Sequence, residues 1–294
     1  MEIPFTKMNS QGNDFIIIDN SLREYELDLD FIIEISSRQN IGCDQLLIVY
    51  VTDALRIDCE IFNQDGTPVR QCGNGLRAVM LYLHKKYGYV DVKIFVKDIA
   101  YLGCYKNDEF ITIDMGQCLF DHDIPQHSIE NIDIIKKDLY FDVSIDNNNS
   151  LLTFSYSPLS IGNFHCVVFS KDSFKEKAKI SSVLQNLYND NANISFILNF
   201  DEFIKKPSKN LSIRVNERGA GWTKSCGSGA TASAAFLMQL FSSEEYGPTI
   251  SKVVIEQSGG LLTVERRQVK SSQHLFLSGP SEHEYESVWN ENIT

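Results

Sequence analysis

A cysteine followed by a Gly-polar-Gly turn and an apolar run occurs twice in this 294-residue chain, and this repeat constrains the fold more than any other feature. The first copy is QCGNGLRAVMLYL, from Gln71 to Leu83, and the second is SCGSGATASAAFL, from Ser225 to Leu237. In both copies the residues after the cysteine read as a helix. Two such elements, half a chain apart, indicate a duplicated fold that directs two thiols at one site.

The neighbouring motifs recur with nearly the same offset as the cysteines. Cys226 follows Cys72 by 154 positions (226 − 72), and Asn163 in GNFHC follows Asn13 in QGNDFIIID by 150 positions (163 − 13). In each half a polar turn precedes an apolar strand, and a later turn precedes the cysteine and its helix. A period this long indicates two related domains, because a solenoid repeat would be far shorter.

Local periodicity predicts short strands around one main helix in each half, which favours an α+β fold over parallel βαβ units. In the first half, strands are predicted at 15–18, 46–51, 56–62, 92–96, 100–105 and 110–115, with helices at 29–37 and from Cys72 to a stop at Gly88. In the second half, strands are predicted at 252–257, 260–264 and 274–277, with a helix at 174–188. The stretch from Cys118 to Ile145 reads as irregular.

These elements predict two pseudo-symmetric domains, each a mixed sheet or barrel around a central helix, with the active site in the cleft between them. We expect the first domain to comprise residues 1–118 plus 280–294 and the second to comprise residues 119–279. Closure of the two halves over the substrate would exclude water from the reaction.

Composition narrows the class of partner. The formal net charge of −12 argues against nucleic acid and anionic membranes, which both favour a basic surface. No apolar run approaches the ~18 to 20 residues of a membrane span, and MEIPFTKMNSQGND has no basic segment followed by an apolar one. We therefore expect a soluble, cytoplasmic protein. The net charge says nothing about a small-molecule substrate, whose site can differ locally from the rest of the surface.

The seven cysteines do not indicate a disulfide framework or a metal site. Their number is odd, and neither C-x-x-C nor H-E-x-x-H occurs. The thiols outside the repeat fall mostly in apolar strand contexts, where a cysteine is usually a small buried hydrophobe. These five structural thiols are Cys43, Cys59, Cys104, Cys118 and Cys166.

The repeated cysteines suit acid/base chemistry. A helix N-terminus has unpaired N–H groups and a partial positive charge, so CGNG and CGSG are plausible carboxylate cradles that also favour a thiolate. Two such elements would hold one carboxylate and present a thiol to each side of the adjacent carbon. One thiolate would remove the α-proton and the other thiol would protonate the opposite face. Hydrogen bonds to the carboxylate would stabilise the carbanion-like transition state, so no cofactor is required.

Other interpretations of the cysteines remain open. A single cysteine before a glycine-rich helix start is more often structural than catalytic, and only the pairing reverses that preference. Cys72 could instead be the nucleophile of a Cys–His hydrolase with His165 as its base, but this leaves the second copy unexplained. A non-catalytic binding protein is disfavoured because both cysteines and their glycines are present.

Several blocks of the sequence resemble one known family. QGNDFIIID, CDQLL, FNQDG, QCGNG, GNFHC, ANISF, NERGAG and CGSGA occur in this order over nearly the whole chain. They resemble the diaminopimelate epimerases, which need no pyridoxal phosphate. These enzymes interconvert LL- and meso-2,6-diaminopimelate on the route to lysine and peptidoglycan.

The resemblance implies roles for particular residues. Cys72 and Cys226 would be the two acid/base thiols. The backbone of the residues after each cysteine would hold the reacting carboxylate: Gly73, Asn74, Gly227 and Ser228. The distal amino-acid group would be bound by Asn63, Asn193 and Arg218. The pocket would be lined by Asn13, Gln45, Asn163 and Glu217, which would take the reacting ammonium or order the thiols, and His165 would tune a thiol.

The chemistry of the substrate is compatible with this assignment. Diaminopimelate carries a charged amino-acid group at each end, so its site should contain a guanidinium able to pair with a carboxylate, and Arg218 beside Glu217 supplies both signs. The alternative without a functional role is that Glu217 and Arg218 form a solvated charge pair and that the four asparagines, Asn13, Asn63, Asn163 and Asn193, only form turns. A homodimer would be compatible with the resemblance. A racemase of another amino acid on the same scaffold is the alternative function.

The chain also departs from the family pattern. Asn9-Ser10-Gln11 stands where the family usually has His-Gly-Leu, Phe164 stands where it has proline, and Trp222 occupies the variable position of GAG-x-T. None of these removes an expected proton-transfer or carboxylate group. Phe164 and Trp222 adjoin expected site residues, so the shape of the pocket is the property they would change.

Overall fold

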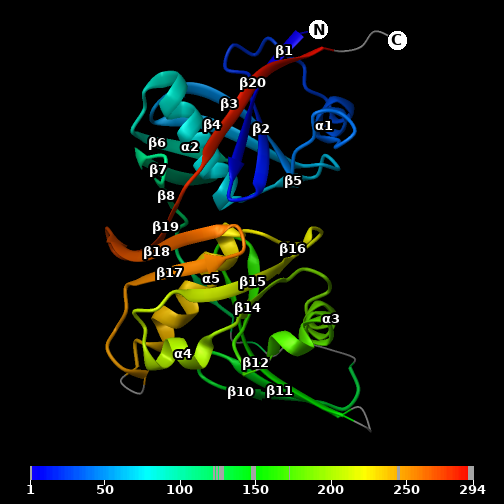
Figure 1. The fold of residues 1–294 in the computed structure, drawn as a ribbon, viewed down its shortest axis with the longest axis vertical. Helices are drawn as coiled ribbons and strands as arrows, with labels where there is room; N and C mark the ends of the chain where they lie inside the picture. The colour runs from blue at the N-terminus through cyan, green and yellow to red at the C-terminus, as the bar shows by residue number, and fades with distance from the viewer. Residues whose placement is uncertain are drawn as a thin grey trace. The chain divides into compact units, whose positions relative to one another are not determined.

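The computed structural model describes residues 2–121, 123, 125, 129–146, 150–171, 173–243 and 246–290, and it divides into two compact units. The first unit is Met1–Asp114 with Leu277–Thr294, and the second is Met115–Phe276. Each unit consists mainly of strands with a few helices, so the predicted α+β class is confirmed (Figure 1). The ends of the predicted first domain, residue 1 and residues 291–294, lie outside the described residues.

The first unit contains two helices and nine strands in the described residues, in addition to the end of a strand shared with the second unit. In chain order they are β1 (Glu2–Ser10), β2 (Asn13–Asp19), α1 (Leu29–Ser36), β3 (Gln45–Asp53), β4 (Arg56–Asn63), β5 (Pro68–Val69), α2 (Gly73–Tyr87), β6 (Asp91–Val96), β7 (Ile99–Asn107), β8 (Phe110–Asp114) and β20 (Glu282–Asn290). The predicted helices and strands of this half are confirmed, and β1, β5 and β20 were not predicted.

The second unit has a similar succession of elements. They are β9 (Leu119–Phe120), β10 (Ile132–Lys136), β11 (Phe141–Asp146), β12 (Leu151–Ser160), β13 (Phe164–Val168), the 3₁₀ helix η1 (Ser173–Glu176), α3 (Lys177–Leu187), β14 (Asn193–Ile197), α4 (Phe200–Lys205), β15 (Leu211–Glu217), β16 (Gly221–Thr223), α5 (Gly227–Leu240), β17 (Lys252–Gln257), β18 (Gly260–Val269) and β19 (Ser272–Gly279). The chain passes into the first unit within β19.

The strand pairings of the two units match one another. In the first unit β2 runs parallel to β3, β3 antiparallel to β4, β4 parallel to β6, and β6 antiparallel to β7. In the second unit β13, β14, β15, β17 and β18 repeat the same sequence of directions. The antiparallel pair β1–β2 likewise corresponds to β12–β13, and β4–β5 to β15–β16. The internal duplication inferred from the cysteine elements is therefore present in the hydrogen-bonded ladders.

One buried helix follows the cysteine in each unit. In α2 the residues from Gly73 to Leu83 are buried, and the helix ends at Gly88, whose φ of 73° is the left-handed conformation that glycine adopts without strain. In α5 every residue from Gly227 to Met238 is buried, and this helix is rich in alanine and serine. Small side chains let α5 lie close to the strands that it covers.

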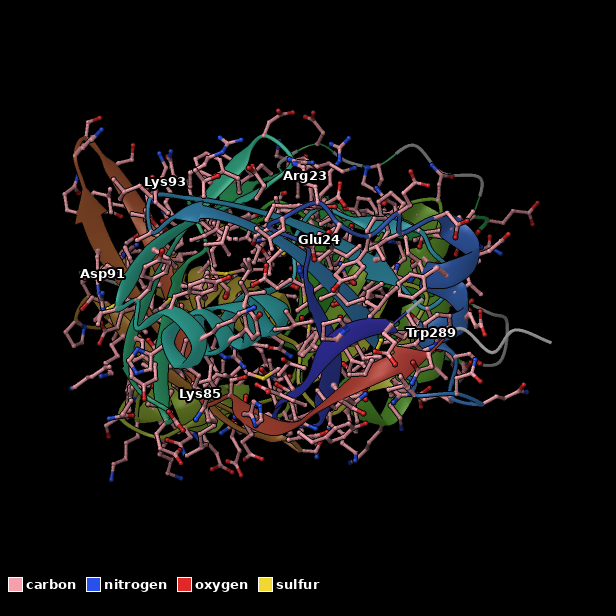
Figure 2. The ribbon with its side chains drawn as sticks, turned by 90° about the horizontal axis from the view of Figure 1, so that it is seen from above. Arg23, Glu24, Lys85, Asp91, Lys93 and Trp289 are labelled. Atoms are coloured by element: carbon pink, nitrogen blue, oxygen red, sulfur yellow. The ribbon has the colours of Figure 1, made fainter. Side chains whose placement is uncertain are left out.

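The last described strand completes the sheet of the first unit. Strand β20, red in Figure 1, pairs antiparallel with β1 and carries Trp289 (Figure 2). The Trp289 ring packs edge-on against Phe31 of α1, with ring centroids 5.1 Å apart. Trp289 belongs to a core cluster with Ile3, Ile16 and Leu46. The C-terminal segment thus contributes core side chains to the unit that begins the chain.

The prediction that the stretch from Cys118 to Ile145 is irregular was wrong for residues 119–120, 132–136 and 141–145, and its residues 122, 124 and 126–128 lie outside the described residues. It contains β9, β10 and most of β11, and β11 places Phe141, Val143 and Ile145 in the core at alternate positions. β10 is half-exposed and mixes charged with apolar residues, so its alternation is weak in the sequence. Its pairing with β11 fixes it as a strand. In the described residues, every helix is too short or too polar to cross a lipid bilayer.

Helix α5 lies closer to its sheet than α2 does, so a glycine-to-alanine substitution in the first turn should affect stability differently in the two helices. A Cβ on Gly229 would lie 2.7 Å from Val215 Cγ2 and 3.0 Å from Ser195 Oγ, whereas one on Gly75 would have its nearest contacts at 3.4 Å. We expect Gly229→Ala to lower the free energy of unfolding by about 1 to 3 kcal/mol through overpacking. Gly75→Ala, the matched control, should stay within about 1 kcal/mol of wild type because alanine favours the helix. Urea unfolding of both variants checks this, and equal destabilisation would contradict it.

Candidate active site

Cys72 forms the start of α2. It is the N-cap residue, with extended backbone (φ −147°, ψ 100°), and its Sγ accepts a hydrogen bond of 3.2 Å from the Gly75 N–H. A thiol in this position satisfies one of the free amides of the first turn and lies in the positive field of the helix N-terminus. Gly75 has no Cβ, which leaves room between Cys72 Sγ and the core side chains of Phe15 and Leu47. The Cys-Gly-polar-Gly pattern of the sequence therefore forms a helix N-terminus that is capped by a thiol.

The strand directions bring three predicted residues to one edge of the first unit. β2 and β3 are parallel, so Asn13 and Gln45, which begin them, lie at the same edge. β4 is antiparallel to β3, so its last residue, Asn63, lies directly opposite Gln45. Gln45 Nε2 donates to Asn63 Oδ1 at 3.2 Å, and Asn63 donates in turn to Thr67 Oγ1 at 2.9 Å.

This edge is joined to the start of α2 by hydrogen bonds. Asn74 Nδ2 donates to Asn13 Oδ1 at 3.4 Å, and Asn13 Nδ2 donates to Asp44 Oδ2 at 2.9 Å. Ser10 Oγ also donates to the Asn74 carbonyl at 3.0 Å. Within the first unit the structure therefore brings Asn13, Asn74 and Cys72 together, with Gln45 and Asn63 at the same strand edge.

A charged network fixes the beginning of β2 against the beginning of β3. Arg38 donates to both oxygens of Asp14, at 2.7 and 2.6 Å, and its Nη2 also donates to Asp44 at 2.6 Å. The buried Lys7 ammonium pairs with Asp14 and donates to the Gly42 carbonyl. Burial opposes ionisation of Asp14, but Arg38 and Lys7 together hold the pKa of that carboxyl well below its usual range.

Cys226 caps α5 in the same way as Cys72 caps α2. Its Sγ accepts from the Gly229 N–H at 3.3 Å and lies 3.4 Å from the Ser228 hydroxyl. Gln257, which no sequence pattern indicated, brackets its backbone: the Cys226 N–H donates to Gln257 Oε1 at 2.9 Å, and Gln257 Nε2 donates to the Cys226 carbonyl at 3.2 Å. Gln257 ends β17 and comes near Cys226 only through the fold.

Asn163 and His165 extend the group of polar residues around Cys226 in the second unit. Asn163 Nδ2 donates to Ser228 Oγ at 3.2 Å, and His165 Nε2 lies 3.1 Å from Asn163 Oδ1. Asn163 and Ser228 correspond to Asn13 and Asn74 in the first unit, so the link between the polar turn and the cysteine helix occurs in both copies. His165 is fully buried, and burial lowers its pKa to about 3. It is therefore a neutral imidazole near pH 7.

The predicted distal-binding residues of the second unit also contact one another. Asn193 Oδ1 accepts from the Arg218 backbone N–H at 3.1 Å, and Asn193 Nδ2 donates to the Phe164 carbonyl at 3.1 Å. Arg218 is exposed, and its guanidinium donates to Asn191. Its remaining N–H groups can pair with a carboxylate from solvent.

The electrostatic surroundings of Cys226 favour the protonated thiol. Burial raises the pKa of Cys226 well above its usual value, and the neighbouring Glu217 carboxylate raises it further. The Ser228 hydroxyl and the Gly229 amide act in the opposite direction. Glu217 is held by a hydrogen bond from Thr223 Oγ1, across the β15–β16 hairpin.

Phe164 and Trp222 lie on the opposite face of the sheet from α5. Side chains alternate along a strand, and Val215 of β15 faces Gly229 of α5. Trp222 is paired with Asn216, on the other face, and its ring lies 5.7 Å from that of Phe174 and 5.8 Å from that of Phe196. Phe164 likewise packs on the core cluster beneath α3, 4.7 Å from the Tyr188 ring. Both departures from the family pattern therefore extend away from the cysteine helix of their unit.

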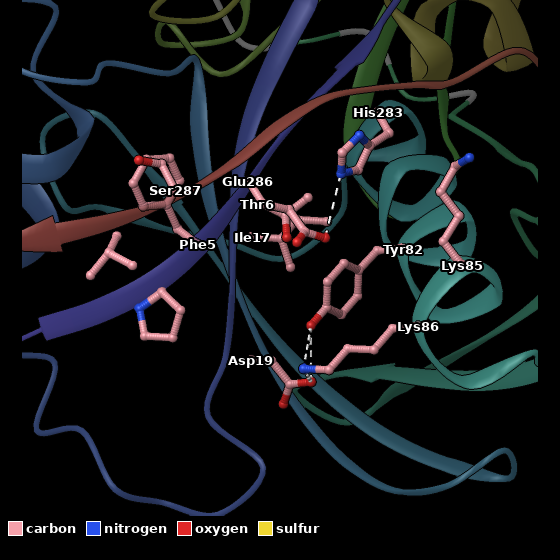
Figure 3. A pocket seen from close by; sticks show the side chains of 12 residues that line it. Phe5, Thr6, Ile17, Asp19, Tyr82, Lys85, Lys86, His283, Glu286 and Ser287 are labelled. Atoms are coloured by element: carbon pink, nitrogen blue, oxygen red, sulfur yellow. Dashed lines mark hydrogen bonds and ion pairs between the residues drawn. The ribbon is translucent and has the colours of Figure 1, made fainter.

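A separate cavity of about 690 Å³ opens near the C-terminal half of α2. Figure 3 shows Tyr82, Lys86 and Asp19 on one side of it and His283 and Glu286 of β20 on another. None of the predicted site residues lines it. In the described part of the chain, no three His, Cys, Asp or Glu side chains are grouped in a way that could hold a metal ion.

Comparisons of the sequence with known proteins agree on one family. A family model described as diaminopimelate epimerase matches residues 5–117. Curated diaminopimelate epimerases from Buchnera aphidicola subsp. Baizongia pistaciae and from Vesicomyosocius okutanii are 31% and 32% identical over 300 and 301 aligned residues. These alignments cover 98% and 97% of this chain and 96% and 98% of those proteins.

Solved structures share the fold at low identity. A phenazine biosynthesis protein of the PhzF family from Bacillus anthracis superposes with a TM-score of 0.65 at 16% identity, covering 99% of this chain and all of that one. A hydroxyproline epimerase from Agrobacterium vitis, with bound trans-4-hydroxy-L-proline, also gives 0.65, at 10% identity, with coverages of 98% and 91%. At these identities the likeness concerns the fold alone.

The burial of His165 predicts its protonation state. Because desolvation lowers its pKa to about 3, the folded protein should keep this imidazole neutral between pH 8 and about 4. The unfolded chain takes up the proton near pH 6.5, so His165 should favour unfolding progressively as the pH falls below that value. Histidine ¹⁵N NMR of the folded protein checks this against the urea-unfolded protein. A His165 resonance that titrates near pH 6.5 in both states would contradict it.

Proposed function

The chain belongs to the diaminopimelate epimerase family, and we propose that it interconverts LL- and meso-2,6-diaminopimelate by proton transfer at one α-carbon. The family assignment rests on 31% identity over 98% of the chain. The structural observation that supports the chemistry is the pair of thiol-capped helix N-termini, one in each unit, built on matching ladders.

The carboxylate next to the reacting carbon would bind the helix N-termini. The first-turn amides after Cys72 and Cys226 belong to Gly73, Asn74, Gly227 and Ser228 and are not used by the helices themselves. Such amides, with the positive end of the helix dipole, stabilise negative charge. As the α-proton leaves, negative charge develops on the carboxylate oxygens, so these amides would stabilise the transition state more than the bound substrate.

Inversion of the stereocentre needs a proton carrier on each face of the α-carbon. One cysteine thiolate would accept the α-proton, and the electron pair of the broken C–H bond would move into the substrate carboxylate as an enediolate. The other thiol would donate its proton to the opposite face, which restores the carboxylate. Each turnover would leave the two thiols with exchanged protonation states. The residues would return to their starting state by the reverse reaction or by exchange with water.

The distal amino-acid group of the substrate would be held by polar residues outside the helix termini. Arg218 would pair with the distal carboxylate, since its side chain is exposed and its backbone is held by Asn193. Asn63, held by Gln45 and Thr67, would contribute from the first unit. Glu217, Asn13, Gln45 and Asn163 would take the reacting ammonium or order the thiols. His165 would tune Cys226 through Asn163 and Ser228.

A cofactor-independent racemase of another amino acid is the alternative. The fold is shared with a hydroxyproline epimerase, so fold alone does not select diaminopimelate. Arg218, Asn193 and Asn63 favour a substrate with a second charged end, which proline derivatives lack.

The proposed function also bears on where the protein acts and on whether it forms a dimer. Synthesis of lysine and of peptidoglycan precursors would place the enzyme in the cytoplasm. A homodimer is supported by β20, which in the described residues pairs only with β1 and carries the exposed side chains Tyr285 and Val288. Such an edge can pair with a second chain, and sedimentation equilibrium would test it.

Deuterium exchange tests the reaction. Reduced protein incubated with LL-diaminopimelate in D₂O should incorporate deuterium at one α-carbon and form the meso isomer, as followed by NMR and chiral chromatography. Because the proton delivered to the product comes from a thiol that exchanges with solvent, product should carry the label from the first turnover. An absence of exchange would refute the epimerase, and exchange with proline or another amino acid alone would favour the racemase.

Substitution of either thiol tests the two-base scheme. Cys72→Ala and Cys226→Ala should each lower kcat by about 10²- to 10⁴-fold or more, since each removes a proton carrier from one face. Cys104→Ala, which removes an exposed thiol from β7, is the matched control and should leave kcat unchanged. Circular dichroism would verify folding. Full epimerisation by either catalytic variant would exclude the scheme.

A further inference from the structure

Gln257 is a buried polar side chain that the reaction scheme does not use. It is the last residue of β17, and it is 6% exposed. Its Oε1 accepts from the Cys226 N–H at 2.9 Å, and its Nε2 donates to the Cys226 carbonyl at 3.2 Å. A backbone N–H can only donate and a carbonyl can only accept, so this contact also fixes which way the amide of Gln257 points.

These two hydrogen bonds, called here the amide bracket, imitate a β-ladder. In an antiparallel pair of strands, the N–H and the C=O of one residue can both bond to a single residue opposite. The Cys226 backbone is extended (φ −124°, ψ 108°), and its N–H and C=O both bond to Gln257. The same carbonyl also accepts the first bond of the helix, from the Ala230 N–H at 3.0 Å. The amide bracket therefore holds the residue at which extended chain changes to helix.

The turn after β17 fastens the preceding segment independently of Gln257. The Lys224 carbonyl accepts from the Gly259 N–H at 2.8 Å and from the Ser258 hydroxyl at 3.2 Å. These bonds attach the chain that leads into the cap of α5 to the turn between β17 and β18. A substitution confined to Gln257 leaves them in place, so it would release the Cys226 backbone without detaching the segment.

The position of the Cys226 sulfur depends on this backbone. The backbone conformation sets the direction of the Cα–Cβ bond, and the sulfur then has only three staggered positions about that bond. In the structure the sulfur accepts from the Gly229 N–H at 3.3 Å and lies 3.4 Å from the Ser228 hydroxyl. A rotated Cys226 backbone would carry the sulfur away from both groups. Gln257 thus acts on the thiol through the backbone of Cys226.

The first copy has an apolar side chain at the corresponding position. β6 pairs parallel with β4, as β17 does with β15, and the residue two positions before each strand end lies opposite Ile57 or Leu211. Those two residues are 154 positions apart (211 − 57), as the cysteines are. The strand ends are Val96 and Gln257. Valine has no side-chain donor or acceptor, so the end of β6 cannot hold Cys72 by an amide bracket.

We propose that Gln257 is a positioning residue for proton transfer by Cys226: its side-chain amide holds the backbone of that cysteine so that the thiol keeps its place at the N-terminus of α5. The assignment rests on the proposed function, in which Cys226 serves one face of the α-carbon. It adds a residue of β17 to the group of polar residues around Cys226. Substitution of Gln257 should affect this thiol and leave Cys72 unchanged.

Amide hydrogen exchange tests the bracket without substrate. Protein labelled with ¹⁵N-cysteine gives one amide resonance for each of its seven cysteines, and single cysteine-to-alanine variants assign them. In Gln257→Leu the Cys226 N–H loses its acceptor and should exchange about tenfold faster than in the wild type. The Cys72 N–H is the internal control and should keep its rate. Ser258→Ala, which removes the hydrogen bond to Lys224 from the same turn, is the matched control and should leave both rates unchanged.

Steady-state kinetics separate positioning from a purely structural role. Gln257→Leu should lower kcat by about 10- to 10²-fold with little change in KM, because a displaced thiol transfers protons slowly. Ser258→Ala should keep both constants. Gln257→Glu has the donor and the acceptor of the bracket only while its carboxyl is protonated, which burial favours. Its kcat relative to the wild type should therefore rise as the pH is lowered from about 8 to about 6, whereas the relative kcat of Gln257→Leu should stay constant.

Three outcomes would overturn the proposal. The first is a wild-type exchange rate of the Cys226 N–H in folded Gln257→Leu, which requires no activity measurement. The second is a wild-type kcat in Gln257→Leu although Cys226→Ala is inactive. The third is an equal loss of kcat in Gln257→Leu and Gln257→Glu at every pH, which would make Gln257 a purely structural contact. A wild-type protein that does not epimerise diaminopimelate would instead refute the proposed function, so the two failures are distinguishable.

Discussion

The hydrogen bond from a glycine amide to the sulfur of the cysteine three residues before it sets the geometry of each half of this protein. It requires that the helix begin directly after the cysteine, so that the thiol takes the place that serine or aspartate occupies in most helix caps. Burial of the helix along its first turns also shields this hydrogen bond from competing water. Both α2 and α5 meet these conditions.

The surrounding strands make this helix start part of a larger polar edge. Parallel pairing of β2 with β3, and of β13 with β14, places the first residues of those strands beside one another. One asparagine from each polar turn then reaches the second residue after the cysteine, Asn13 to Asn74 and Asn163 to Ser228. The edge of the first unit is stiffened by the ion pairs of Asp14 with Lys7 and Arg38. This rigidity favours proton transfer, since small displacements of the reacting groups lower the rate strongly.

The two copies share a backbone but differ in charge. The guanidinium of Arg77 is buried in the helix that follows Cys72, whereas Glu217 lies beside Cys226 and Gln257 holds the Cys226 backbone. A duplicated fold gives equivalent positions, and sequence divergence then distinguishes the roles of the residues there. Reversible epimerisation needs one thiol ionised and the other protonated at any moment, which identical surroundings would not favour.

The sequence by itself determined the repeat, the α+β class, the starts of α2 and α5, and the polar residues near them, because helix periodicity, glycine stops and cysteine spacing are local signals. Only the tertiary structure decided which face each side chain occupies and which distant groups it meets. Phe164 and Trp222 neighbour site residues in sequence, yet strand alternation carries them to the opposite side of the sheet from α5. Strands β10 and β11 depend on pairing with one another and β9 on pairing with β12, and Gln257 reaches Cys226 from 31 positions away. The hydrogen bonds of the buried Arg77 are likewise decided by packing, since its partners Gln11 and Pro280 lie 66 and 203 positions away in the sequence.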